Sequence, residues 1–170
     1  MTAIRLRGEP WGTNGYRDII IACNMLEERH PGLVISKMQR LLLMERGTVE
    51  GLLSVLQGNT IDVKVVMQQE DGSTRKMVTE LRGQEASLTL LKATTTIFTD
   101  SIPSDILSEL EDRRFGIGEI LGRYNIETRR EITEIGYDPR SSRFFRTYDI
   151  YANGKVWFTI HESFDQSLYS

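Results

Sequence analysis

The spacing of apolar residues changes near position 60, from a helical repeat to an alternation of apolar and polar side chains. Apolar residues occupy every odd position of 61–67, which is typical of a strand with one buried face. Similar runs follow, separated by turn-forming residues such as the Asn153-Gly154 pair, a strong hairpin signal. The sequence thereby predicts strands near 61–69, 74–82, 86–98, 126–137, 143–152 and 154–163.

Segments with a helical spacing of apolar residues lie before the first of these strands and between the third and the fourth. Residues 17–30 carry apolar side chains at i, i+3, i+4 and i+7, which indicates a helix. Residues 33–45 are dense in apolar groups without a clear period, so an extended and a helical conformation both remain open. Thr48 is a natural N-cap for the next helix, and shorter helices are expected after Pro103 and after 116–118.

Strands joined mostly as hairpins, with helices clustered in the first half and in one insertion, are typical of an α+β fold. We expect a single antiparallel sheet of about six strands with helices packed on one face. Residues 1–16 are rich in glycine and are expected to form an irregular N-terminal arm. Residues 17–170 are expected to form one domain, because a chain of 170 residues leaves little room for a second core.

The last predicted strand carries one carboxylate on an otherwise apolar row. Side chains alternate between the two faces of a strand, so Val156, Phe158, Ile160 and Glu162 point the same way. A carboxylate among core-facing residues is costly unless it is paired or hydrogen-bonded, which makes Glu162 a candidate functional group. The alternative is a strand that has already reached solvent at Glu162, and the pattern leaves both interpretations open.

Arg75 is a second charge in line with mainly apolar neighbours. It shares a strand face with Met77, Thr79 and Leu81. A buried arginine and a buried glutamate of one sheet either neutralise each other or flank a pocket for an anion. The pattern by itself favours a third interpretation, a surface arginine at the start of a strand.

Composition narrows the classes of function. The formal net charge is −3 and the basic residues are scattered, which argues against nucleic acid as the main partner. No apolar run approaches the ~20 residues of a membrane span, so no membrane partner is expected. The single cysteine, Cys23, excludes an internal disulfide and fits a reducing cytoplasm. It lies on the apolar side of a predicted helix, as a buried structural thiol does.

Metal and nucleotide motifs are absent from the sequence. Two histidines and one cysteine make a protein metal site improbable. The run Gly116-x-Gly118-x-x-x-Gly122 follows a charged helix rather than a strand, unlike a dinucleotide-binding fingerprint. We therefore expect no metal and no cofactor.

The C-terminal half resembles the chorismate pyruvate-lyase family, whose members remove pyruvate from chorismate to give 4-hydroxybenzoate. The order and spacing of the shared motifs agree across about 103–164, with a weaker echo across 41–82. The motif residues are Gly116-Ile117-Gly118, Thr128-Arg129, Glu134-Ile135-Gly136, Arg143, Arg146, Gly154-Lys155 and Glu162-Ser163-Phe164. The resemblance implies a chorismate lyase-like fold and a carbon–oxygen lyase that works in the cytoplasm.

The resemblance also implies a set of site residues. A strand arginine and the terminal glutamate of the family contact the bound acid, and they fall on Arg75 and Glu162, the expected catalytic pair. The expected substrate-binding residues are Arg75, Gly47, Thr48, Ile117, Gly118 and Glu162. The chain departs from the family pattern where Gly47 replaces a methionine and Ile117 a leucine, which leaves the identity of the substrate open.

The chemistry of the lyase reaction suits these residue types. Chorismate carries two carboxylates, and the guanidinium fork of arginine matches a carboxylate bidentately. Loss of enolpyruvate makes the ring aromatic, so correct positioning of the substrate supplies much of the acceleration. In this hypothesis Arg75 binds a carboxylate, and Glu162 protonates the departing group or hydrogen-bonds the ring hydroxyl.

Two other classes of function stay open. One is a non-catalytic binding domain for a small aromatic or carboxylic acid effector, since the same fold serves as the effector-sensing domain of some bacterial transcription regulators. Too few residues precede the first predicted strand to hold the winged-helix domain of such a regulator together with the helices of the fold itself. The other class is a protein-interaction module, for which the sequence offers no specific signal. Oligomeric state is open as well.

Overall fold

The computed structural model describes residues 1–6, 16–83, 88–112 and 116–170. Within these ranges, one antiparallel sheet has the spatial order β1-β5-β6-β7-β4-β3-β2. Its strands are β1 (Thr2–Arg5), β2 (Asp62–Asp71), β3 (Thr74–Arg82), β4 (Thr89–Phe98), β5 (Arg129–Asp138), β6 (Arg143–Ala152) and β7 (Lys155–Asp165). Strands β2–β4 and β5–β7 form two meanders, and pairing of β4 with β7 joins them into one sheet.

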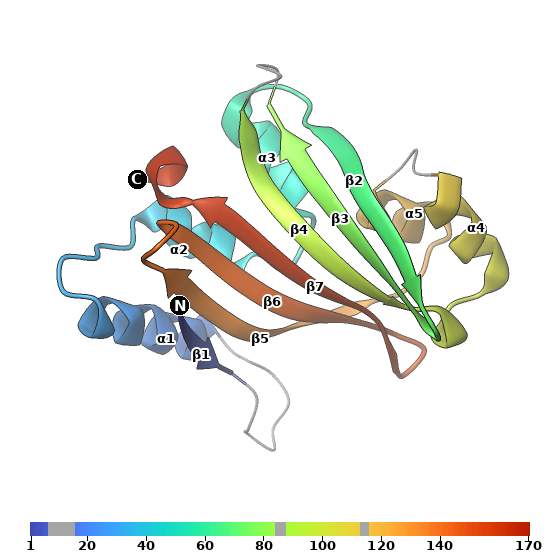
Figure 1. The fold of residues 1–170 in the computed structure, drawn as a ribbon, viewed down its shortest axis with the longest axis horizontal. Coiled ribbons are helices and arrows are strands. Elements are labelled where there is room, and N and C mark those ends of the chain that lie inside the picture. Colours follow the sequence, from blue (N-terminus) through green and yellow to red (C-terminus); the bar gives the residue numbers. More distant parts are fainter. Residues whose placement is uncertain (7–15, 84–87, 113–115) are drawn as a thin grey trace.

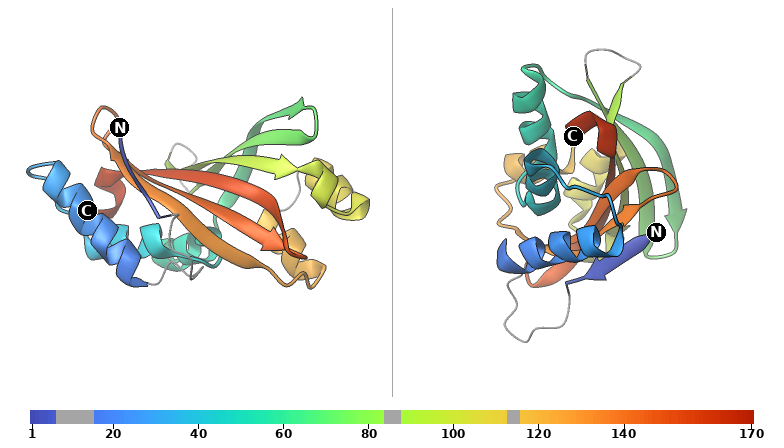
Figure 2. Two further views of the ribbon diagram at one scale, coloured as in Figure 1. Left: turned by 90° about the horizontal axis from the view of Figure 1, so that it is seen from below. Right: turned by 90° about the vertical axis from the view of Figure 1, so that its left-hand side faces the viewer.

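The described helices lie on the same side of this sheet (Figures 1 and 2). They are α1 (Tyr16–Arg29), α2 (Lys37–Met44), α3 (Val49–Gln57), α4 (Ser104–Asp112) and α5 (Ile117–Arg123), with short 3₁₀ turns η1 (Thr99–Ser101) and η2 (Gln166–Tyr169). The structure confirms the predicted α+β class with a single antiparallel sheet and helices on one face. Among the described residues, no helix is long and apolar enough to cross a membrane.

The ambiguous stretch 33–45 contains α2, and a capping box explains why it is helical. The Ser36 hydroxyl accepts a hydrogen bond from the backbone N–H of Gln39, and the Gln39 side chain accepts one from the N–H of Ser36. This reciprocal pair satisfies two N–H groups that have no partner inside the helix. Thr48 is the N-cap of α3, as predicted, although its side chain makes no capping hydrogen bond.

The seventh strand, β1, is a correction to the sequence interpretation, which placed an irregular arm over 1–16. Thr2–Arg5 pair antiparallel with β5, Ala3 opposite Gly136. A four-residue strand is too short to show a period. Gly136 permits the pairing, because a Cβ at that position would lie 2.1 Å from the Phe145 ring and 2.5 Å from the Thr2 carbonyl oxygen. Residues 7–15 of the predicted arm lie outside the described residues, as do residues 86–87 of the strand predicted over 86–98.

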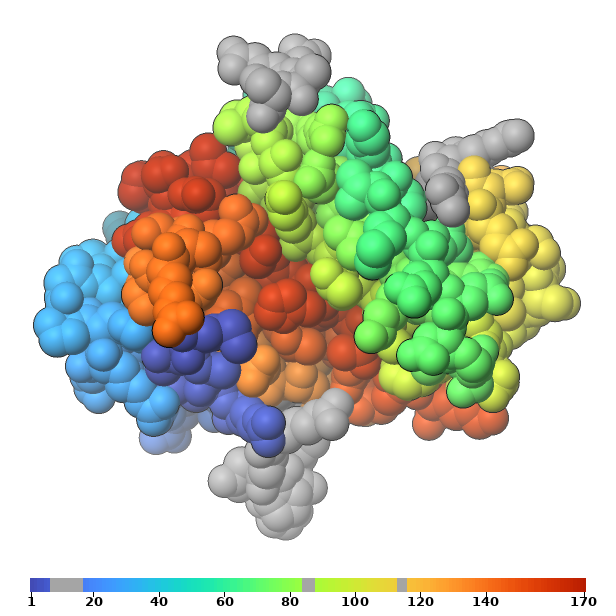
Figure 3. All heavy atoms as spheres, viewed as in Figure 1, coloured from blue at the N-terminus to red at the C-terminus, as the bar shows by residue number. Residues whose placement is uncertain are grey.

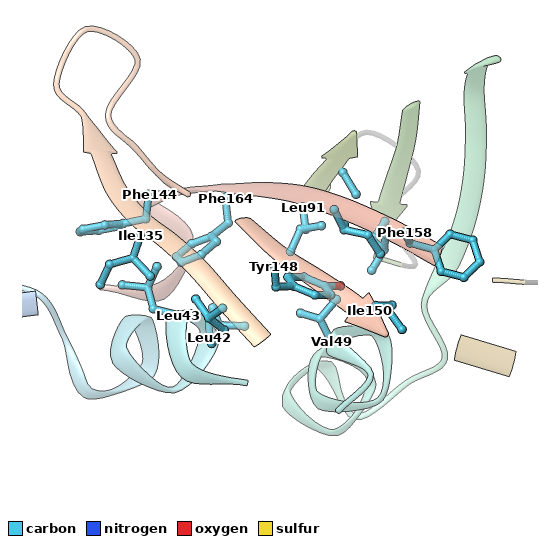
Figure 4. Close-up of a cluster of buried hydrophobic side chains, with 14 of the residues drawn as sticks. Leu42, Leu43, Val49, Leu91, Ile135, Phe144, Tyr148, Ile150, Phe158 and Phe164 are labelled. Atoms are coloured by element: carbon cyan, nitrogen blue, oxygen red, sulfur yellow. The ribbon is translucent and has the colours of Figure 1, made fainter. Parts of the chain in front are cut away.

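The main core lies between the sheet and the helices, and Figure 4 shows a part of it. Phe144 and Tyr148 of β6 and Phe158 and Phe164 of β7 point from the sheet toward the helices. They meet aliphatic side chains such as Val49 at the start of α3. On the opposite face, Figure 3 shows a hollow between β4 and the β5–β6 hairpin, with β7 at its base. Because the helix-facing side of the sheet is buried, the strand residues that point to this side are the ones that can line a site under the helices.

Candidate functional site

A cavity of about 100 Å³ lies between the sheet and the helices that cover it. Gly47 and Thr48 are exposed at its edge, whereas the floor residues Thr79 and Thr95 are buried in the sheet. Half of the lining residues are aliphatic: Val49, Val63, Val65, Met77, Leu81, Ala93, Leu110, Ile117, Ile150 and Ile160. The polar lining residues are Thr48, Glu50, Thr79, Thr95, Arg130, Tyr148 and Glu162. An apolar cavity with a few placed polar groups is the usual form of a small-molecule site.

Glu162 lies on the floor of the cavity and is 3% exposed, so the strand has not reached solvent there. Its Oε2 atom accepts a hydrogen bond from Nε of Arg146 at 2.7 Å and forms an ion pair with Nη2 of the same guanidinium at 2.7 Å, and its Oε1 atom accepts a hydrogen bond from the Tyr148 hydroxyl at 2.8 Å. Burial first, and the Glu162 charge second, raise the pKa of Tyr148 far above its usual range. The phenol therefore stays protonated and donates a hydrogen bond to Glu162.

Two arginines of the sheet hold the segment between α2 and α3 at the cavity. Nη1 of Arg146 donates to the carbonyl oxygen of Glu45, and Nη1 of Arg130 donates to that of Arg46 at 3.2 Å. The N–H of Gly47 donates to the side-chain carboxylate of Glu45. Side-chain donors on backbone carbonyls fix the position of a connecting segment that has no regular structure. The start of α3 is thereby placed over the β5–β6 side of the cavity.

Arg130 brings a half-buried positive charge to this cavity. A Cβ on Gly118 would lie 3.8 Å from Nη2 of Arg130, so the guanidinium lies beside the first turn of α5. Its one hydrogen bond to the described residues is the bond to the Arg46 carbonyl, and none of the described carboxylates forms an ion pair with it. The side chain therefore retains donors that can bind an anion.

Glu50 is the other charged residue of the lining that lacks an ion pair among the described residues. Partial burial, and then the nearby Glu119 carboxylate, raise the pKa of Glu50 above its ordinary value of 4.5. Its Oε2 atom would lie 3.3 Å from a Cβ on Gly116, at the start of α5. The cavity thus contains a cation and an acid whose ionisation is disfavoured.

The structure brings most of the predicted site residues together. Gly47, Thr48, Ile117, Gly118 and Glu162 all line the cavity. They come from the segment before α3, the start of α5 and the end of β7, which are far apart in the sequence. Gly118 permits the close approach of α5 to Thr48, because a Cβ there would lie 2.5 Å from Cγ2 of Thr48. Their roles in binding stay predictions.

Arg75 is the predicted residue that the structure places elsewhere. It is 6% exposed, and its Nη2 atom forms ion pairs with Glu70 at 2.6 Å and Glu111 at 2.7 Å. Arg75 and Glu162 both point to the helix-facing side of the sheet. Thr79 is the residue of β3 in register with Glu162, through Ala93 of β4, and Arg75 lies four residues before Thr79 along β3. Four residues of strand span about 13 Å. The expected common pocket of Arg75 and Glu162 is therefore not formed: Glu162 has Arg146 as its partner, and Arg75 is absent from the cavity lining.

Several residues of the site escaped the sequence interpretation. Arg146 appeared there only as a motif residue. The register of the Asn153-Gly154 turn alone would place it opposite His161, and a bulge between Ile150 and Tyr151 moves it opposite Glu162. Arg130 stands in a strand rich in charges, where no periodicity marks it as inward-facing. Thr79 and Thr95 look like ordinary strand residues. The pairing of Arg146 with Glu162 thus depends on a bulge that the turn residues do not reveal, and Arg130 depends on how the chain packs over β5.

Comparison with known proteins does not identify a family for this chain. No family model and no curated protein matches this sequence. Among solved structures, a transcriptional regulator of the GntR family from Bacillus cereus overlaps with 65% of this chain and 94% of its own, at 11% identity and a TM-score of 0.44. A structural similarity at that level carries no argument, so the function of this chain has to be inferred from the cavity.

Proposed function

We propose that this protein binds a small organic acid in the cavity under α3 and α5, with Arg130 as the cation that receives the carboxylate. The observation that carries the proposal is the Arg130 guanidinium, which lines a mainly apolar cavity and has no carboxylate partner among the described residues. A charge-assisted hydrogen bond to a carboxylate is strengthened where water is scarce. An aromatic or alicyclic acid suits such a site, because the aliphatic lining accommodates its ring.

The internal pairing of Glu162 supports the same proposal. Its charge is balanced by Arg146, so the floor of the cavity carries no unpaired anion at that point. Tyr148 stays protonated, and its hydroxyl oxygen retains a lone pair for a ligand donor. A ligand carboxylate therefore meets one net positive side chain, that of Arg130, on the β5–β6 side.

The direct test is a titration with benzoate, the simplest acid of this shape. The parent is expected to bind it, and Arg130→Met is expected to weaken binding roughly 10- to 100-fold, because a hydrogen bond to a charged group is worth about 1.5–3 kcal/mol. Arg129→Met is the matched control: Arg129 is the exposed preceding residue, whose guanidinium stacks on Tyr151. Arg129→Met should keep the affinity of the parent.

Arg75→Met distinguishes this proposal from the role that the family resemblance assigns to Arg75. If Arg130 receives the carboxylate, Arg75→Met should leave benzoate affinity close to that of the parent. Loss of binding in Arg75→Met together with unchanged binding in Arg130→Met would reject the Arg130 site. Near-UV circular dichroism of each variant checks that the fold is intact.

Chorismate lyase activity is the second candidate, and the position of Glu162 in the cavity lining favours it. Both carboxylate oxygens of Glu162 already accept hydrogen bonds, which suits an anchor for a ring hydroxyl better than a group that gives up a proton. The assay mixes pure protein with chorismate, without added metal, and follows 4-hydroxybenzoate and pyruvate. Decay of chorismate at its uncatalysed rate would reject turnover and leave the binding function.

If turnover occurs, Glu162→Gln separates the two roles. It should lower turnover more than affinity, because the amide keeps the shape of the side chain and part of its hydrogen bonding. In a protein that binds without catalysis, the same change alters affinity alone.

A further inference from the structure

The floor of the cavity has a polar pair on the side away from Arg130. Thr79 of β3 is 6% exposed and Thr95 of β4 is 2% exposed, and both line the cavity. No described residue forms a hydrogen bond with either hydroxyl. Both hydroxyls open to the cavity rather than being sealed in the core, so they are available to a hydrogen-bonding group of a ligand.

The register of the sheet places these threonines opposite the charged side of the cavity. Thr95 pairs with Ile160, and Ile160 pairs with Tyr148, so Thr95 and Tyr148 are the ends of one row across β4, β7 and β6. Thr79 pairs with Ala93, and Ala93 pairs with Glu162, which gives a second row of the same kind. Neighbouring strands lie about 4.8 Å apart, so each row spans about 10 Å.

Both rows therefore have the same composition, with a polar group at each end and an aliphatic side chain between them. On the β6–β7 side the polar groups are Tyr148 and Glu162, beside Arg130. On the β3–β4 side they are the two free hydroxyls. The Cα positions of the two ends are about 10 Å apart, so a ligand that reaches from Arg130 to the threonines extends across the cavity.

We infer that Thr79 and Thr95 form a second polar subsite, which selects acids that carry a hydrogen-bonding group at the end opposite the carboxylate. The inference rests on the proposed acid-binding function and adds the ligand class to it. A hydroxyl both donates and accepts, so the pair takes a ring hydroxyl, an amino group or a carbonyl. An acid without such a group leaves both hydroxyls without a partner.

The test compares three ligands that differ at one position: benzoate, 4-methylbenzoate and 4-hydroxybenzoate. In the parent, 4-hydroxybenzoate should bind roughly 3- to 10-fold more tightly than the other two, as expected for one net hydrogen bond. Thr79→Val and Thr95→Val keep the side-chain shape but remove the hydroxyl. In at least one of them the preference should fall to about onefold, with benzoate affinity kept or raised.

Thr94→Val is the matched control, because Thr94 is the exposed residue before Thr95 and points to the other face of the sheet. It should keep the full preference for 4-hydroxybenzoate. A stability measurement without ligand separates the subsite from a structural role. Since neither hydroxyl has a partner, each valine variant should unfold at the same urea concentration as the parent or at a higher one.

The outcomes distinguish the two proposals. Benzoate binding that depends on Arg130, with no preference for 4-hydroxybenzoate, overturns the threonine subsite alone. A preference that survives in both valine variants, or their marked destabilisation without ligand, overturns it as well. Failure of all three acids to bind the parent overturns both the acid-binding function and the subsite.

Discussion

Arg146 of β6 and Glu162 of β7 face each other across the sheet and form a buried ion pair, with 2.7 Å between Nε and Oε2. Their side chains are 1% and 3% exposed. The Tyr148 hydroxyl and the Glu45 carbonyl complete the cluster. The Glu162 charge, which the sequence singled out in the last strand, is thus neutralised by Arg146 inside the fold. Through the Glu45 carbonyl, the same pair connects the β6–β7 hairpin to the segment before α3.

Removing one partner of this pair should destabilise the protein strongly. Arg146→Met leaves the Glu162 carboxylate buried without its counter-charge, and such a change costs about 3–5 kcal/mol of unfolding free energy. Urea unfolding followed by circular dichroism measures this loss. Arg140→Met, at an exposed turn position, is the control and should cost almost nothing. The double variant Arg146→Met/Glu162→Leu should recover most of the loss, and a double variant as unstable as the single one would contradict the argument.

The thiol of Cys23 should be unreactive in the native protein. Burial in the core is the main cause that raises its pKa to about 11, with the Glu27 charge adding to the increase and Arg40 opposing it. The thiolate reacts with disulfide reagents, and at neutral pH a pKa of this size lowers the thiolate fraction by roughly two orders of magnitude. Labelling with an aromatic disulfide should be slow in buffer and fast in 6–8 M urea, roughly the range that unfolds most domains. Rapid labelling in buffer would show that α1 opens from the sheet.

The sequence predicted the sheet better than the site, for a physical reason. Alternation in β2, β3 and β7 and the Asn153-Gly154 turn are local signals, so the strands and their hairpins follow from neighbouring residues. The Ser36–Gln39 capping box was also local and was overlooked. The partners of Arg75 were harder to foresee, because Glu111 comes from α4, whose position over the end of the sheet is set by packing.

Glu162 illustrates the middle case between local and long-range signals. Its inward direction was visible in the strand pattern, and the structure confirms its burial. Its partner Arg146 depends on a bulge that shifts the hairpin register by one residue, and the sequence hypothesis matched Glu162 with Arg75 through the resemblance. Arg130 had no local signal at all, since its approach to Gly118 and its hydrogen bond to the Arg46 carbonyl exist only after α3 and α5 have packed on the sheet.

Stability should depend on pH through Glu50. Burial and Glu119 raise its pKa in the folded state above the ordinary value of 4.5, so the native state holds this proton at a pH where the unfolded state has lost it. Unfolding free energy therefore falls as pH rises from about the ordinary pKa through the raised folded pKa. Glu50→Gln should be more stable than the parent at pH 7–8, and the difference should vanish near pH 4. Urea midpoints across that range measure it.

The control for this pH dependence is Glu28→Gln, which removes the same charge from an exposed position on α1. Its difference from the parent should stay nearly constant with pH. The same Glu50→Gln variant should also bind benzoate more tightly at pH 7–8, because it removes a negative charge from the cavity that receives the carboxylate. An unchanged pH profile in Glu50→Gln would show that the Glu50 carboxylate is as well solvated in the folded state as in the unfolded one.

Two glycines of α5 provide a matched test of the cavity. A Cβ on Gly118 would lie 2.5 Å from Cγ2 of Thr48 and 3.8 Å from Nη2 of Arg130, whereas a Cβ on Gly122 would meet nothing within 4 Å. Gly122→Ala should raise the unfolding free energy by about 0.5–1 kcal/mol, since alanine restricts the unfolded chain and favours a helix. Gly118→Ala brings the same propensity gain to the same helix, but Thr48 has to move.

The Gly118→Ala variant is therefore expected to be less stable than Gly122→Ala and to bind benzoate more weakly than the parent, because α5 and Thr48 no longer approach each other beside Arg130. Gly122→Ala should bind benzoate as the parent does. Thr48→Ser removes the methyl group that the new Cβ would meet, so Gly118→Ala/Thr48→Ser should recover affinity and part of the stability. Titration and urea unfolding of the four proteins give both quantities. Equal affinity in Gly118→Ala and Gly122→Ala would show that the ligand does not bind against the first turn of α5.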